Sequence, residues 1–296
     1  MSDPASAVLV ASGGPALRSA ARFACAAMAV TFQVFIAGED AAYAAQAADA
    51  ALGELARLEQ DLSRFIPTSD VARLATAPPG AKVRVGLEAF ECLRTAERVR
   101  RETGGAFDVT AAGAHPARDA ITLDESDHSV ALARGGAGVD LGGIGKGYAL
   151  DRMAGVLRDW SITAALLDAG GSTVLALGAP AGEPGWPVAV GGAETPVGAI
   201  GRMLLRRGAL AGSAASPAHP HILDPRTSRP VLAKRAAWAL APSAAEADAL
   251  STAFFVMSPD EVRRYCESHG DVSAMLAVDA TRGTKVARFG TWHLVT

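Results

Sequence analysis

The sequence predicts an α+β fold, in which strands and helices are interleaved without the regular spacing of a doubly wound parallel sheet. Val30, Phe32, Val34 and Ile36 alternate with other residues, as in a strand, whereas later segments repeat apolar residues at helical spacing. The 296 residues are 50% hydrophobic, enough for a large core in one domain or two closely packed halves. We predict a flexible segment over 1–20 and a single domain over 21–296.

Three helices are expected in the first 160 residues. The first begins near Asp40 and places small and aliphatic residues on one face. These are Ala48, Ala51, Leu55, Leu58 and Leu62. The second runs from about Leu87 to Glu102 and stops at Gly104. The third follows a glycine-rich segment and continues to about Leu157.

Strands and two capped helices are expected around and after these. Residues 82–85 resemble a short strand, and 121–123 with 129–132 a hairpin; 163–238 consists mainly of strands broken by glycine and proline. Ser243 with Glu246, and Ser258 with Glu261, have the spacing of a capping box, so a helix should begin at each. Gly270 should end the second of these helices, and short strands finish the chain.

Composition excludes several classes of protein. The net charge of -3 gives no basic excess for a nucleic-acid partner. The three cysteines are far apart and form no Cys-x-x-Cys pair, so free buried thiols are expected. The N-terminal residues lack the basic start and long apolar run of a secretory signal, and no stretch is long and apolar enough to span a membrane. We therefore expect a cytoplasmic protein.

Asp248 and Thr252 are the first candidates for chemistry. They are four residues apart on a helix whose start is well marked, so one helix face presents a carboxylate and a hydroxyl together. Two oxygen donors suit Mg²⁺, which retains sites for water or substrate phosphate. The alternative is an ordinary solvated helix face.

A glycine-rich segment surrounds Lys146 just before a helix. Its glycines are Gly142, Gly143, Gly145 and Gly147. Glycines let backbone N–H groups approach a phosphate, and a helix N-terminus favours anions. The segment matches neither a Walker loop nor the dinucleotide fingerprint, and a tight turn with a surface lysine is the alternative.

Two further candidates are weaker. His221 is a possible general base, because histidine transfers protons near neutrality, although a lone histidine is often structural. Gly105 to Asp108 could wrap backbone and one carboxylate around a ligand; the alternative is a helix C-cap followed by a strand.

Taken together, these motifs closely resemble the ApbE family, the FAD:protein FMN transferases. The resemblance covers roughly residues 28–290. It rests on GAFD at 105–108, DLGGIGKGY at 140–148, HILDPRT at 221–227 and ADALSTA at 247–253, with looser matches at Met28 to Thr31 and Ser63 to Phe65. The resemblance implies mixed or antiparallel sheets with flanking helices and an FAD site between two packed halves.

The resemblance also implies roles for individual residues. Asp248, Thr252 and the carbonyl of Gly143 would hold Mg²⁺, and His221 or Asp248 would assist deprotonation. The FAD site would be lined by Met28, Phe65, Ala106, Phe107, Asp108, Asp140, Lys146 and His221. Phe65 stands where the family usually has tyrosine, so it can stack on the flavin but lacks the hydroxyl.

The implied reaction is Mg²⁺-dependent transfer of FMN from FAD to a threonine or serine of an acceptor flavoprotein, with release of AMP. The loop after Phe107-Asp108 and the region before His221 are shorter than usual in the family, which affects acceptor recognition. Two alternatives stay open: an FAD pyrophosphatase that yields FMN and AMP, and a non-catalytic FAD-binding protein. The working metal could also be Mn²⁺, since both cations accept oxygen ligands.

Overall fold

The computed structural model describes residues 8–10, 15–111, 121–133, 138–192, 197–214, 222–232, 234–280 and 283–295. Its centre is an eight-stranded sheet with neighbours in the order β16-β15-β14-β11-β8-β7-β3-β2, every pair antiparallel. The strands are β2 (Ala21–Ala27), β3 (Val30–Ile36), β7 (Ala165–Ala169), β8 (Thr173–Ala176), β11 (Gly208–Ala214), β14 (Lys234–Ala241), β15 (Ser273–Ala280) and β16 (Gly283–Phe289).

A second sheet, in the order β1-β9-β10-β17, packs on one face of the first. Its strands are β1 (Val8–Val10), β9 (Trp186–Gly192), β10 (Gly198–Leu205) and β17 (Leu294–Val295). Val188, Val190 and Met203 meet Trp238 and Met275 of the large sheet in a core between the sheets. This interface leaves the other face of the large sheet for the helices.

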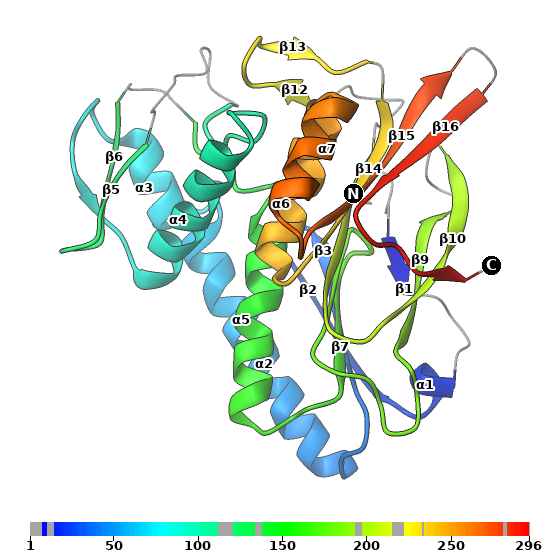
Figure 1. Ribbon diagram of the computed structural model, residues 1–296. Coiled ribbons are helices and arrows are strands. Elements are labelled where there is room, and N and C mark those ends of the chain that lie inside the picture. The colour runs from blue at the N-terminus through cyan, green and yellow to red at the C-terminus, as the bar shows by residue number, and fades with distance from the viewer. Residues whose placement is uncertain are drawn as a thin grey trace.

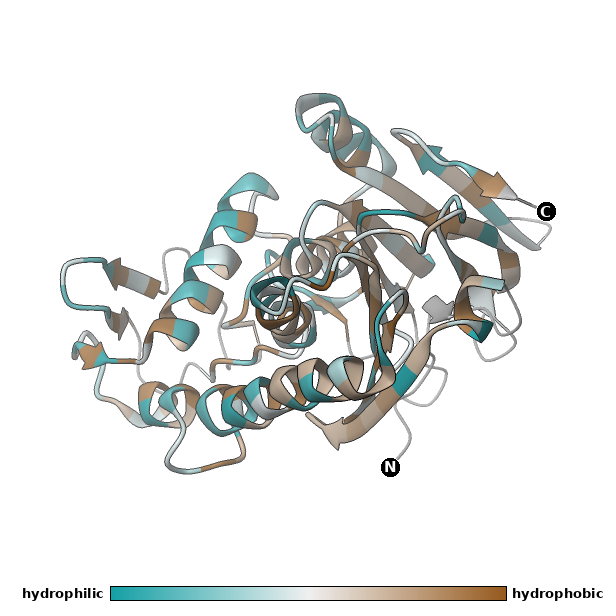
Figure 2. Ribbon diagram, turned by 90° about the horizontal axis from the view of Figure 1, so that it is seen from below, coloured by the Kyte–Doolittle hydropathy of each residue, from teal (hydrophilic) through white to brown (hydrophobic). Residues whose placement is uncertain are grey.

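Most of the helices cover that other face and extend beyond it (Figure 1). They are α2 (Ala41–Leu62), α3 (Asp70–Thr76), α4 (Leu87–Glu102), α5 (Gly145–Asp159), α6 (Ala244–Val256) and α7 (Pro259–Ser268). The short α1 (Pro15–Arg18) instead packs beside β9 of the second sheet. A three-stranded sheet of β4 (Val83–Arg84), β5 (Ile121–Asp124) and β6 (Ser129–Leu132) lies beside α3 and α4, and β12 (Leu223–Asp224) pairs with β13 (Arg229–Pro230). In Figure 2 the helix at the centre of the view is mostly brown, that is, hydrophobic, whereas the peripheral helices are a mixture of teal and brown. No helix in the described ranges is long and apolar enough to cross a membrane.

The α+β class and the predicted antiparallel sheets are confirmed. The helix over 87–102 agrees with α4, and the capping box of Ser258 and Glu261 forms at the start of α7, with Pro259 in its first turn. At α6 the Ser243 hydroxyl accepts the N–H of Glu246, while the Glu246 carboxylate pairs with Arg98 of α4. Local capping chemistry therefore fixed the helix starts that the sequence predicts.

The structure differs from the prediction at the N-terminus. Within the predicted flexible segment, Val8–Val10 forms β1, which pairs with β9, and Pro15–Arg18 forms α1. Only three apolar residues mark β1, and its partner lies about 180 positions along the chain (Val8 opposite Val190), so no local signal identifies it. The alanine-rich β2 and the short α3 were likewise not predicted from the sequence.

The end of α6 is closed by a side chain from the sheet. Lys234 of β14 is buried, and its ammonium group donates to the carbonyls of Phe255 and Met257. Burial lowers the pKa of Lys234 to about 8. A cation at a helix C-terminus satisfies carbonyls that have no partner within the helix, so this contact ties α6 to the large sheet.

Candidate active site

Helices α5 and α6 approach each other closely at Gly147. A Cβ atom at this position would lie 2.1 Å from the carbonyl oxygen of Ala244 and 2.8 Å from the Cβ of Asp248. Only glycine fits such a backbone contact. The last glycine of the glycine-rich segment is therefore explained by helix packing.

Asp151, one turn further along α5, holds the start of α6. Its two carboxylate oxygens accept the N–H groups of Ala244 and Ala245, each at 2.8 Å. Burial raises the pKa of Asp151 to about 6, although the two hydrogen bonds act in the opposite direction. A carboxylate at a helix N-terminus also interacts favourably with the positive end of the helix dipole. Asp151 therefore holds the start of α6 against α5.

Asp248 lies at the centre of this junction with 5% of its surface exposed. Its Oδ2 accepts the N–H of Gly147 at 3.1 Å, and its Oδ1 accepts the hydroxyl of Thr173 at 3.1 Å. The buried Cys92 lies near enough that the Asp248 charge adds to the burial that raises the thiol pKa. Asp248 therefore does not lie on an ordinary solvated helix face, which was the alternative interpretation of the sequence.

Thr252 follows one turn later on α6 and faces the glycine-rich segment. A Cβ added at Gly143 would lie 3.1 Å from the Thr252 hydroxyl oxygen and 3.2 Å from the Phe107 ring. The hydroxyl is also 3.3 Å from that of Ser213 on β11. The residues expected to hold a cation, Asp248, Thr252 and Gly143, thus come together from α6 and the segment before α5.

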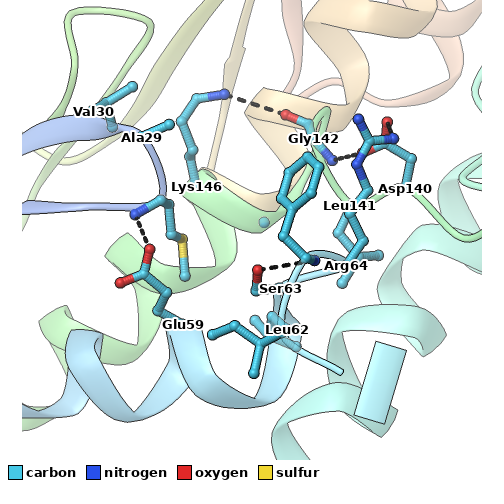
Figure 3. Close-up of a pocket in the computed structure, with 14 residues that line it drawn as sticks. Ala29, Val30, Glu59, Leu62, Ser63, Arg64, Asp140, Leu141, Gly142 and Lys146 are labelled. Atoms are coloured by element: carbon cyan, nitrogen blue, oxygen red, sulfur yellow. Dashed lines mark hydrogen bonds and ion pairs between the residues drawn. The ribbon is translucent and has the colours of Figure 1, made fainter. Parts of the chain in front are cut away.

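A cavity of about 590 Å³ opens on the other side of the same segment (Figure 3). The residues that line it come from the β2–β3 turn, the end of α2 and the segment that leads into α5. They are Met28, Ala29, Val30, Glu59, Leu62, Ser63, Arg64, Phe65, Ile66, Asp140, Leu141, Gly142, Gly145 and Lys146. Four predicted FAD-site residues, Met28, Phe65, Asp140 and Lys146, therefore share one cavity.

The charged side chains around this cavity form an ion pair and several hydrogen bonds to the backbone (Figure 3). The Arg64 guanidinium lies 2.8 Å from an Asp140 oxygen and 4.7 Å from the centre of the Phe65 ring. Lys146 donates to the carbonyl of Gly142 at 3.2 Å. Phe65 is 80% exposed, so its ring offers an aromatic surface at the cavity wall.

The wall at Met28 has an unusual backbone. Met28 and Ala29 have φ angles of +49° and +64°, and the Met28 N–H donates to Glu59 at 2.6 Å. Non-glycine residues rarely adopt this left-handed region, and such strain is concentrated at ligand sites. Glu59 of α2 therefore holds the turn that contributes to the cavity.

The segment from Ala106 to Asp108 was expected either to wrap around a ligand or to follow a helix C-cap as a strand, and the structure shows a third arrangement. Gly104 and Gly105 end α4 with positive φ angles, as a C-cap requires, but a turn follows in place of a strand. Asp108 accepts the N–H and hydroxyl of Thr110. Ala106 and Phe107 are buried, and the Phe107 ring lies against Gly143.

His221 lies outside the described residues, and its role stays a prediction. The chain after it forms the β12–β13 hairpin, in which Arg226 pairs with Asp224 and Glu261. The Cγ of Arg226 lies 3.7 Å from where a Cβ at Gly105 would be, so the hairpin lies beside the end of α4. Arg64, Glu59 and Thr173 were not predicted as site residues, because their partners are distant in the sequence.

Comparison with known proteins found a matching family and several structures with a similar fold. The sequence pattern of the ApbE family matches residues 28–276. A structure of the flavin transferase ApbE from Vibrio cholerae superimposes with a TM-score of 0.77 at 18% identity, over 91% of this chain and 97% of that one. The ApbE protein from Thermotoga maritima gives 0.77 at 24% identity with the same coverage. The apo form of the flavinyl transferase ApbE from Pseudomonas stutzeri has a TM-score of 0.77 at 20% sequence identity, over 91% of this chain and 94% of that one. No curated protein sequence matched.

Proposed function

The chain belongs to the ApbE family, and from this premise we propose that it transfers FMN from FAD to a threonine or serine hydroxyl of an acceptor flavoprotein, releasing AMP. One observation carries the proposal. The segment from Asp140 to Gly147 lines a cavity of about 590 Å³ on one side and meets Asp248 and Thr252 on the other. A flavin site and a phosphate site would thus adjoin.

The cavity suits the flavin half of FAD. Its volume falls in the range of small-molecule sites, and Met28, Leu62 and Phe65 supply apolar surface. Phe65 would stack on the isoalloxazine ring, and Lys146 would neutralise phosphate charge next to the start of α5. We propose that Ala106, Phe107 and Asp108 also line the FAD site, together with His221 from the chain before β12.

The junction of α5 and α6 fits a magnesium ion. In the described ranges no cluster of three or more His, Cys, Asp or Glu side chains could hold a metal. The donors here are one carboxylate, one hydroxyl and the carbonyl of Gly143, and Mg²⁺ commonly binds through one or two carboxylates together with substrate phosphates. Asp248, Thr252 and Gly143 would hold it, and a bound Mg²⁺ would draw charge from the pyrophosphate. Mn²⁺ would suit the same oxygens.

In the proposed step, the acceptor hydroxyl oxygen forms a bond to the FMN-side phosphorus while the bond from that phosphorus to the bridging oxygen breaks. AMP leaves with the bridging oxygen, and the hydroxyl proton passes to a base. Both Asp248 oxygens already accept hydrogen bonds, which supports Asp248 as a ligand and leaves His221 as the proposed base. Such transfers depend mainly on positioning and charge stabilisation.

The test is incubation of the protein with FAD, Mg²⁺ and flavoprotein subunits from its own genome. Mass spectrometry should find one FMN added to a subunit, together with AMP, and EDTA should prevent both. Asp248→Asn and Thr252→Val should each lose at least about 100-fold in rate, as expected when a charge-stabilising group is removed. Asp49→Asn, an exposed position on α2, is the matched control and should retain the parent rate.

Other results would point elsewhere. AMP with free FMN and no labelled subunit would indicate an FAD pyrophosphatase. Bound but unchanged FAD would indicate an FAD-binding protein. Folded Asp248→Asn and Thr252→Val variants that transfer FMN at the parent rate would contradict the proposal.

A further inference from the structure

Asp248 is held at both oxygens by groups that do not belong to its own helix. Gly147 N–H comes from α5 and the Thr173 hydroxyl from β8, each at 3.1 Å. The side chain is buried, so neither bond is exposed to competing water. The orientation of this carboxylate is therefore set by its surroundings.

Thr173 is an unusual residue for its place in the sheet. It is fully buried, it opens a strand whose other members are Val174, Leu175 and Ala176, and it pairs with Ala169 and Ala211 on the neighbouring strands. A hydroxyl in such surroundings is unfavourable unless it forms a hydrogen bond. Valine has nearly the same shape, so packing alone does not require threonine here.

We infer that Thr173 is a positioning residue that aims the Asp248 carboxylate at the cation. The inference rests on the proposed function. By donating to Oδ1 while the Gly147 N–H donates to Oδ2, the hydroxyl fixes the rotation of the carboxylate, and each oxygen keeps a lone pair for a cation. Partners that orient a metal ligand in this way contribute substantially to affinity.

The test compares Thr173→Val, which removes the hydroxyl and keeps the volume, with Thr173→Ser, which keeps it. Binding of Mn²⁺ alone is followed by the electron paramagnetic resonance signal of the free ion, with no FAD or acceptor present. Thr173→Val should bind Mn²⁺ about tenfold more weakly than the parent, whereas Thr173→Ser should restore most of the affinity. Thr95→Val on α4, whose hydroxyl donates only within its own helix, should bind like the parent.

Asp248→Ala separates this inference from the proposed function. If Asp248→Ala binds Mn²⁺ as tightly as the parent, the proposed metal site itself is wrong. If Asp248→Ala loses binding while Thr173→Val keeps the parent affinity or exceeds it, only the positioning role is overturned. Should Thr173→Val fail to fold, Thr173→Ala is measured in its place, and equal affinities of folded Thr173→Ala and Thr173→Ser would overturn the inference.

Discussion

Gly147→Ala tests the packing of α5 against α6 most directly. The new Cβ would lie 2.1 Å from the carbonyl oxygen and 2.5 Å from the carbonyl carbon of Ala244. An ordinary contact needs well over 3 Å, so the two helices must move apart by roughly an ångström, as in other overpacked cores. Because both obstructing atoms are backbone, no side-chain rotation relieves the contact.

The expected loss follows from two contributions. Overpacking of this kind lowers the free energy of unfolding by about 1–3 kcal/mol. Separation of the helices also weakens the bond from Gly147 N–H to Asp248 and those from Ala244 and Ala245 to Asp151, each worth about 1 kcal/mol. We expect a total loss of about 3 kcal/mol and a fall in the unfolding midpoint of roughly 6–12 °C.

Gly155 is the matched control on the same helix. No atom lies within 4 Å of where its Cβ would be, so Gly155→Ala meets no obstacle. It should raise the free energy of unfolding by about 0.5–1 kcal/mol, because alanine restricts the unfolded chain and favours a helix. Thermal and urea unfolding, followed by circular dichroism, measure both variants. A Gly147→Ala protein as stable as Gly155→Ala would contradict the close approach of α5 and α6 at Gly147.

Three further changes address the cavity and the ends of α6. Arg64→Gln should weaken FAD binding by about two- to fivefold in a flavin fluorescence titration, because the guanidinium no longer lies against Phe65; equal affinity would exclude that role. Asp151 has a pKa of about 6 in the folded protein against 3.8 for a free carboxyl, so the folded protein holds this proton more tightly. The contribution of Asp151 to the free energy of unfolding therefore falls as pH rises from about 4 to about 6. In urea unfolding, Asp151→Asn should lose less stability over that interval than the parent. Lys234→Met leaves the last carbonyls of α6 without their donor and should lower the free energy of unfolding by about 1–3 kcal/mol, whereas the exposed Lys285→Met should change it little.

The sequence predicted most helices because their signals are local. Ser258 and Glu261 lie three residues apart and cap α7 in the way their spacing indicates. The strand β2 carries no such signal: Ala21–Ala27 is rich in small residues, it pairs with β3, and its Phe23 and Cys25 pack against the core. Pairing between distant segments is a property of the whole fold and cannot be inferred from a short window.

At the candidate site too, residues with local sequence signals were predicted and contacts between distant segments were not. Residues within the motifs, such as Asp248 and Lys146, were predicted individually, and the structure shows which of them are neighbours. Arg64 was missed because Asp140, its partner, lies 76 positions away. Thr173 was missed for a similar reason, since 75 positions separate it from Asp248. Contacts of this kind become visible only when the strands and helices are assembled.

The glycine-rich segment explains why the cavity and the α5–α6 junction are adjacent. Some of its residues, among them Gly142 and Lys146, line the cavity, whereas Gly143 contacts Thr252 and Gly147 contacts the start of α6. Lys146 and Gly147 are neighbours in the first turn of α5 and therefore point about 100° apart around the helix. Glycine at 143 and 147 allows α6 to approach from one side while the other side stays open to a ligand. In the proposed function, the segment from Asp140 to Gly147 would therefore place a flavin in the cavity next to a phosphate group at Asp248.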